Sequence, residues 1–117
     1  MKDLKGDKAR LLHIRDAIVE IEEYTRAFDF QQFYHQSMAR FASIKQLEII
    51  GEAANHLSGE LIEKYPDVEW REIIALRNIL IHEYFGVDAK IVWDIISEHL
   101  PALKKAVEMI LKDFESV

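Results

Sequence analysis

Hydrophobic residues recur along this chain at the three- and four-residue spacing of amphipathic α-helices. The first such stretch runs from about Asp7 to Phe28, with Asp7 as the expected N-cap. Its apolar positions are Leu11, Ile14, Ile18, Ile21, Tyr24 or Thr25, and Phe28. Asp29 then marks a break and is a candidate N-cap for a short helical turn that follows it.

A second long helix is predicted from Gln36 or Ser37 to His56. The positions expected to be buried are Phe41, Ile44, Leu47, Ile49, Ile50, Ala53, Ala54 and Leu57. Gly51 interrupts this stripe, although glycine costs a helix about 1 kcal/mol relative to alanine. We therefore expect another backbone to approach the helix closely at Gly51. A short helical connector over 61–65 ends at Pro66.

The third helix is expected to start near Asp67, its predicted cap, and to continue through the polar cluster described below. Its apolar residues are Trp70, Ile73, Ile74 and Leu76. The last helical stretch follows Gly86, with Asp88 as cap, and Pro101 must kink or divide it because proline removes a donor. No segment alternates with a period of two. The pattern predicts a single all-α domain over 1–117, an up-down bundle of four or five helices.

Residues 77–84 hold a cation, an imidazole and a phenol among aliphatic residues. On an ideal α-helix Tyr84 lies about 20° from Arg77, whereas His82 lies about 140° away. His82 is one turn beyond Asn78, close enough for a hydrogen bond that fixes its tautomer. For Arg77 and His82 to meet on one phosphate, the helix must loosen near His82, or two copies must face each other.

These residue types suit phosphodiester chemistry. The planar fork of Arg77 matches a phosphate, and His82 can transfer protons near neutral pH. Tyr84 could bind a phosphate, stack on a base or be modified. Such a reaction needs no metal, and the segment lacks the carboxylate cluster that Mg²⁺ prefers. The alternative is a buried helix in which the arginine pairs with an acid and the histidine belongs to the core.

The charge and composition of the chain limit the kinds of partner that it can bind. Lys and Arg total 15 against 21 Asp and Glu, a net charge of −6. This balance argues against sequence-blind adhesion to nucleic acid and fits a partner protein with a basic face. The chain has no cysteine, no segment like a signal peptide and no apolar run of membrane-spanning length. We therefore expect a soluble, cytoplasmic protein without disulfides.

Five histidines invite a metal hypothesis, but they are scattered and lack the facing Glu-x-x-His pairs of metal sites in helical bundles. They are His13, His35, His56, His82 and His99. No metal or other cofactor is expected.

Two further groups of residues are candidates for the site. Glu52, next to Gly51, is expected to pair with a cation such as Arg77, whereas Glu48 is expected to be solvated. Four aromatic residues cluster after the first helix: Phe28, Phe30, Phe33 and Tyr34. Core or dimer packing is the first interpretation of this cluster, and a base-stacking surface is the second.

The sequence resembles the HEPN superfamily, specifically its HepT-like branch. The branch motif R-N-x-x-x-H-x-Y corresponds to Arg77, Asn78, His82 and Tyr84. Further similarity covers 45–54, 65–74, 87–93 and 100–103, in the order expected for the branch. The chain departs from the usual pattern at Ala75, where the branch often has glycine, and at Lys45, where it often has arginine.

The resemblance implies a metal-independent ribonuclease toxin that works as a homodimer, with the motifs of two protomers lining one cleft. Arg77 would hold the scissile phosphate, His82 would transfer protons and Asn78 would orient them. The resemblance also implies a nucleotidyltransferase antitoxin that transfers AMP to Tyr84, adding negative charge that competes with RNA for Arg77. Two rival hypotheses are a non-catalytic helical adaptor for a nucleotidyltransferase and a purely structural dimer.

Overall fold

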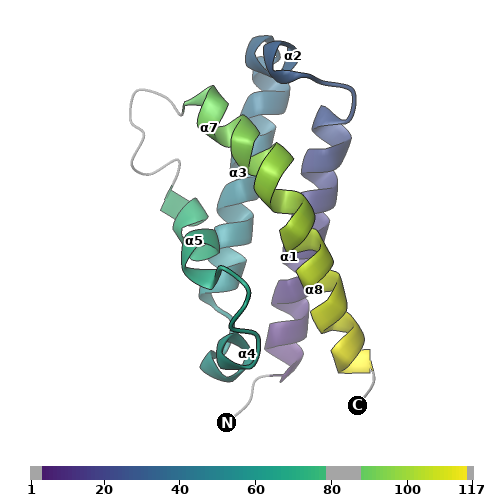
Figure 1. Cartoon of the computed structure of the whole chain (residues 1–117), viewed down its shortest axis with the longest axis vertical. Helices are drawn as coiled ribbons and strands as arrows, with labels where there is room; N and C mark the ends of the chain where they lie inside the picture. The colour runs from purple at the N-terminus through teal and green to yellow at the C-terminus, as the bar shows by residue number, and fades with distance from the viewer. Residues whose placement is uncertain (1–3, 79–87, 116–117) are drawn as a thin grey trace.

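The computed structural model describes residues 4–78 and 88–115, and all the regular structure in these ranges is helical. The elements are α1 (Leu4–Thr25), α2 (Phe30–His35), α3 (Ser37–Asn55), α4 (Gly59–Lys64), α5 (Trp70–Ala75), the 3₁₀ helix η1 (Leu76–Asn78), α7 (Ala89–Asp94), the π-helix η2 (Ile95–His99) and α8 (Leu100–Glu115). Helices α1 and α3 run antiparallel, and α8 crosses them obliquely (Figure 1). The predicted all-α bundle is confirmed.

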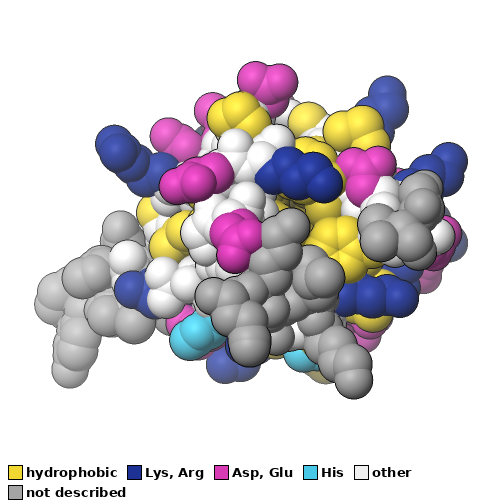
Figure 2. All heavy atoms as spheres, turned by 90° about the horizontal axis from the view of Figure 1, so that it is seen from below, with side chains coloured by type: hydrophobic (Ala, Val, Ile, Leu, Met, Phe, Trp, Pro, Cys, Tyr) yellow, Lys and Arg dark blue, Asp and Glu magenta, His cyan; other side chains and the backbone are white. Residues whose placement is uncertain are grey.

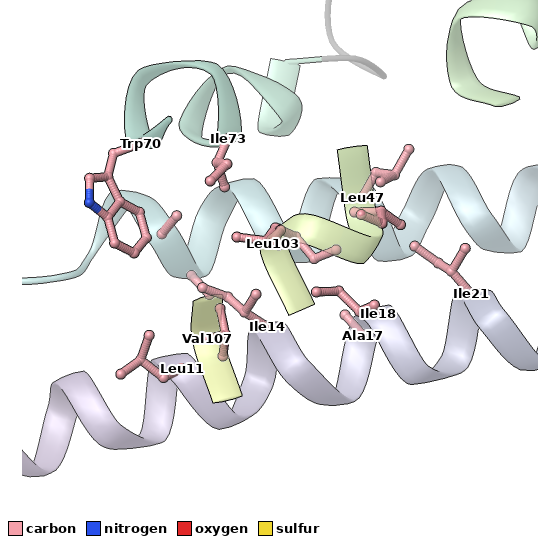
Figure 3. Packing of buried hydrophobic residues seen from close by; sticks show 14 of the residues in the cluster. Leu11, Ile14, Ala17, Ile18, Ile21, Leu47, Trp70, Ile73, Leu103 and Val107 are labelled. Atoms are coloured by element: carbon pink, nitrogen blue, oxygen red, sulfur yellow. The ribbon is translucent and has the colours of Figure 1, made fainter. Parts of the chain in front are cut away.

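The core lies between α1, α3 and α8. Leu11, Ile14 and Ile18 project from α1 toward α3 and α8, and Leu103 of α8 lies between α1 and α3 (Figure 3). Trp70 and Ile73 bring α5 against the same cluster (Figure 3). Fully burying one large aliphatic side chain contributes about 1.5–3 kcal/mol. The apolar residues at helical spacing lie on the facing sides of the three helices, so their burial holds the helices together.

Two of the predicted helix caps are present. The Asp29 side chain accepts a hydrogen bond from the Gln32 backbone, and the Gln32 side chain accepts one from Asp29 N, a reciprocal capping box. Asp88 caps α7 by accepting from Lys90 N and Ile91 N. These caps hold the ends of the short helices α2 and α7.

The other two predicted caps are wrong. Asp7 lies inside α1 and is buried, and its carboxylate accepts hydrogen bonds from Ser58 N (2.9 Å) and Ser58 Oγ (2.6 Å). Asp7 therefore ties α1 to the N-cap of α4 instead of capping its own helix. Asp67 caps nothing, because a turn after Pro66 delays the start of α5 until Trp70, whose indole donates to the Tyr65 carbonyl at 2.9 Å.

Pro101 divides the last helical stretch, as predicted. The chain is α-helical over Ala89–Asp94, widens to a π-helix over Ile95–His99 and resumes as α8 at Leu100. The Leu100 N–H bonds to the Ile95 carbonyl, five residues back. This wider turn accommodates a residue that has no backbone donor and crowds the preceding turn.

One predicted core residue is wrong. Phe41 is 61% exposed, whereas Ile44, Leu47 and Ile50 are buried. Nine residues separate Phe41 from Ile50, a rotation of about 180° on an α-helix, so the two cannot share one buried stripe. In the aromatic cluster, Phe33 is fully buried 5.1 Å from the Trp93 ring.

The other aromatic residues of that cluster are less buried. Phe28 is partly buried against the core, whereas Tyr34 is 53% exposed. Core packing therefore holds for part of the cluster only.

Gly51 is where α3 and η1 touch. A Cβ built on Gly51 would lie 2.3 Å from Arg77 N and 3.0 Å from both Arg77 Cα and Leu76 C. Only a residue without a side chain allows this approach, which confirms the close backbone contact expected from the sequence. The contact fixes the position of the Arg77 backbone against α3.

We expect Gly51→Ala to destabilise the protein although alanine is the better helix former. The added methyl group must displace the backbone of η1, and such overpacking typically costs about 1–3 kcal/mol, measured as the free energy of urea unfolding. Gly59→Ala is the matched control, because no atom lies within 4 Å of a Cβ built on that helical glycine. Equal stability of the two variants would contradict the close contact.

Ionisation of Tyr65 makes the free energy of unfolding vary with pH in the alkaline range. Its hydroxyl donates to Asp113 Oδ2 at 2.6 Å, and burial, then this hydrogen bond and the Asp113 charge, raise the pKa of Tyr65 from 10.0 to about 12. The folded state therefore holds the proton more tightly, so this stabilisation is present below pH 10 and is lost between pH 10 and about 12.

Tyr65→Phe should remove this component of the pH dependence. Urea unfolding of wild type and Tyr65→Phe on either side of pH 10 isolates it, because all other titrating groups are shared. The exposed Tyr34→Phe serves as the control and should follow wild type. Parallel pH profiles for wild type and Tyr65→Phe would show that the Asp113 contact does not influence stability.

Candidate active site

A hollow of about 390 Å³ lies between α3 and η1. Its lining residues are Lys45, Glu48, Ile49, Glu52, Arg77 and Asn78. The first four belong to α3 and lie within about 100° of one another around that helix, so they share one face of it. The Gly51 contact brings η1 alongside this part of α3. Two of the predicted site residues, Arg77 and Asn78, therefore reach the hollow together with the predicted supporting residue Glu52.

Arg77 lies on a 3₁₀ helix and not on the α-helix predicted for the whole motif. A 3₁₀ helix has three residues per turn, so the angles calculated for an ideal α-helix do not apply at this end of the motif. The Arg77 side chain is 36% exposed, and its Nη1 lies 3.9 Å from Glu52 Oε2. The predicted Arg77–Glu52 pair is thus present, but it is long and lies at the surface. An arginine paired with an acid also belongs to the alternative interpretation, and the core histidine of that alternative, His82, lies outside the described residues.

Glu52 contacts two side chains, those of Arg77 and His56. While Oε2 faces Arg77, Oε1 lies 2.9 Å from Nε2 of His56, one turn further along α3. The sequence analysis missed His56, although its i,i+4 spacing from Glu52 was visible. This second contact holds the carboxylate at the edge of the hollow.

Lys45 is a second cation that sequence reasoning did not assign to the site. Its Nζ lies 3.4 Å from Glu48 Oε1. Glu48 was predicted to be solvated, but only 27% of its side chain is exposed. Lys45 and Arg77 line the same hollow only because α3 and η1 meet at Gly51. A local sequence pattern therefore could not predict that Lys45 belongs to the site.

The two cations of the hollow each face a carboxylate. The lining charges therefore balance, and the hollow is not a strong anion site on its own. Both pairs are exposed to water, where ion pairs contribute little. A phosphate could replace a carboxylate at Arg77, because guanidinium binds phosphate with two parallel hydrogen bonds.

The remaining two motif residues, His82 and Tyr84, lie outside the described residues, as does Gly86. The meeting of Arg77 with His82 in one cleft therefore stays a prediction, and so does the position of the modified hydroxyl. The structure describes Asn78, which is half-buried at the hollow.

Two further features of the described residues concern metal binding and membrane spanning. No three His, Asp or Glu side chains within 4–78 and 88–115 are grouped so that they could hold a metal ion. In the same ranges, no helix has the length and apolar character needed to cross a membrane. At the end of the molecule where α1 begins and α8 ends, the coloured acidic and basic side chains are interspersed (Figure 2).

The chain is similar to proteins that are named as ribonucleases. A protein called "Putative RNase MJ1380" from Methanocaldococcus jannaschii is 43% identical over 103 residues, which is 88% of this chain and 94% of that protein. "Probable ribonuclease HepT" from Thermococcus cleftensis is 39% identical over 108 residues, 92% of this chain and 98% of its own length. No solved structure matches the chain significantly.

The family comparison covers most of the bundle. The profile that describes the ribonuclease HepT-like family matches residues 14–110, which include the hollow, η1 and most of α8. The resemblance drawn from the motif and the flanking segments is confirmed. The chain belongs to the HepT-like ribonuclease family.

Proposed function

We propose that this protein is a metal-independent endoribonuclease toxin that uses Arg77 and His82 in a cleft shared by two protomers. Family membership and the names of the relatives support a ribonuclease. The observation that carries the proposal is the position of Arg77, which the Gly51 contact fixes at an open hollow with only a loose carboxylate partner.

In this proposal Arg77 binds the scissile phosphate and stabilises the charge that develops on it. As the attacking oxygen bonds to phosphorus it loses a proton, and as the bond to the departing oxygen breaks that oxygen gains one. His82 serves these proton transfers, since imidazole titrates near neutral pH. Asn78 orients the pair, and Glu52 holds the guanidinium until a phosphate replaces it.

The second part of the proposal concerns silencing. A nucleotidyltransferase antitoxin transfers AMP to Tyr84: the phenol oxygen attacks the α-phosphate of ATP, pyrophosphate leaves, and the phenol proton passes to a base of the transferase. The added phosphodiester is negatively charged, so it competes with RNA for Arg77. The net charge of −6 already disfavours RNA, so losing this arginine weakens phosphate binding further.

Removing either reactive residue should abolish RNA cleavage. We expect His82→Ala to slow cleavage by about 10²–10⁴-fold because a positioned acid–base group contributes that much. Arg77→Lys should not restore what Arg77→Ala loses, since lysine lacks the planar fork. The assay follows a labelled single-stranded RNA with EDTA present. Arg71→Ala, which removes an exposed cation from the same helical segment, is the control and should cleave as wild type does.

The rival adaptor hypothesis predicts a different outcome. An adaptor cuts no RNA, its expression is as harmless as that of His82→Ala, and both forms still bind a nucleotidyltransferase. The balanced charges of the hollow favour this rival, so growth after induction should be measured beside cleavage. Cleavage that disappears with EDTA would overturn the metal-independent mechanism.

AMP transfer should depend on a single tyrosine. Incubation with the nucleotidyltransferase and ATP should raise the mass of wild type by one or more AMP units, while Tyr84→Phe should keep its mass. His82→Ala should still be modified, which separates modification from cleavage. Tyr34→Phe is the matched control, because Tyr34 is 53% exposed and lies elsewhere on the bundle. Modification of Tyr84→Phe would contradict the proposed target.

A further inference from the structure

A larger hollow of about 620 Å³ lies between α5 and η1 on one side and η2 and α8 on the other. We call it the α5–α8 groove. Its apolar lining residues are Val68, Ile73, Leu76, Ile95, Leu100, Ala102, Leu103, Ala106 and Met109. The floor includes Leu100 and Leu103 of the core, whereas Met109 is 57% exposed at the surface. The groove thus continues the core outwards as an apolar surface open to solvent.

The rim of the α5–α8 groove is acidic. Four of its lining residues are carboxylates, Asp67, Glu69, Glu72 and Glu98, and all four are exposed. Among the described residues that line the groove, the only other polar one is the exposed His99, and none is Lys or Arg.

These four carboxylates differ from acids elsewhere in the bundle. None of the four forms an ion pair or a side-chain hydrogen bond with another described residue. By contrast, Glu22 lies 2.9 Å from Lys104 and Asp94 lies 3.0 Å from Lys90. The rim charges therefore remain available to a partner.

The dimensions suit a helix. Leu100 and Met109 are nine residues apart on α8, which corresponds to about 14 Å, between two and three helical turns. An amphipathic helix binds in such a groove by placing its apolar face on the floor, with its polar residues over the rims. A small-molecule site normally has polar groups that converge to orient the ligand. Here the polar side chains are exposed at the rim, so a helix fits better than a small ligand.

The charge of the rim determines the kind of helix. We propose that the α5–α8 groove is the docking site for a positively charged amphipathic helix of a partner protein. Lysine or arginine beside the apolar face of that helix would meet carboxylates on both walls of the groove. A second copy of this chain, with a net charge of −6, is a poorer electrostatic match. The proposal does not depend on RNA cleavage.

A synthetic peptide tests the groove directly. The probe is a fluorescein-labelled peptide of about fourteen residues, with leucines at helical spacing and lysines elsewhere. Fluorescence anisotropy with the full chain should show saturable binding that weakens with salt. A peptide with glutamate in place of lysine, and one with the same residues scrambled to remove the apolar face, should not bind.

Two matched double variants locate the binding. Glu72→Lys with Glu98→Lys should weaken binding about tenfold or more, because two attractive contacts become repulsive. Glu20→Lys with Glu63→Lys makes the same change in net charge at exposed positions outside the groove and should change binding less than about twofold. Ala106→Trp fills the groove without a charge change and should abolish binding. Circular dichroism and thermal melting check that each variant is folded.

Three results would overturn the docking site. One is the absence of saturable binding by wild type, and another is equal weakening by the two double variants, which would indicate general electrostatic attraction. The third is a change in sedimentation coefficient with the groove variants while peptide binding persists, which would assign the groove to contact between copies. If Ala106→Trp fails to fold, the comparison of the charge variants still decides the question.

Discussion

The contact between the backbones of α3 and η1 at Gly51 determines the geometry of the functional end of this bundle. Because the backbone of η1 lies directly against α3 at Gly51, the Arg77 side chain starts from a fixed point beside that helix. The hollow lies beside this contact and is lined on α3 by Lys45, Glu48 and Glu52. The missing side chain at Gly51 thus determines where the arginine backbone lies beside the hollow.

The distribution of carboxylates distinguishes two functional surfaces. In the hollow, Glu48 and Glu52 each face a cation, so the charges of the lining side chains cancel unless a competing anion displaces a carboxylate. Along the α5–α8 groove, Glu72 and Glu98 face no cation among the described residues. Paired carboxylates restrain cations within the chain, whereas unpaired ones attract cations from outside. The acidic net charge, which argues against loose RNA binding, is accounted for partly by this groove.

Most of the fold could be predicted because the helices are amphipathic and their stripes converge on one core. Gly51 could be recognised because its helix-propensity cost needed compensation. The failures have both long-range and local causes. Asp7 reads locally as a cap, yet its partner Ser58 is distant in sequence, and the burial of Phe41 fails because a three-residue spacing drifts around a helix. The hollow itself required tertiary structure, since Lys45 and Arg77 share no local pattern.

The bond between Asp7 and Ser58 has a consequence for the order of folding. Helix α4 has six residues, too few to persist alone in water. Its first turn is held by Ser58, which in turn is held by the buried carboxylate of α1. Helix α4 therefore depends for its stability on the contact of its N-cap with α1, and we expect the two to form together. In the native state, the same dependence makes α4 a cooperative extension of α1 and not an independent unit, so its amides exchange with solvent when the end of α1 opens.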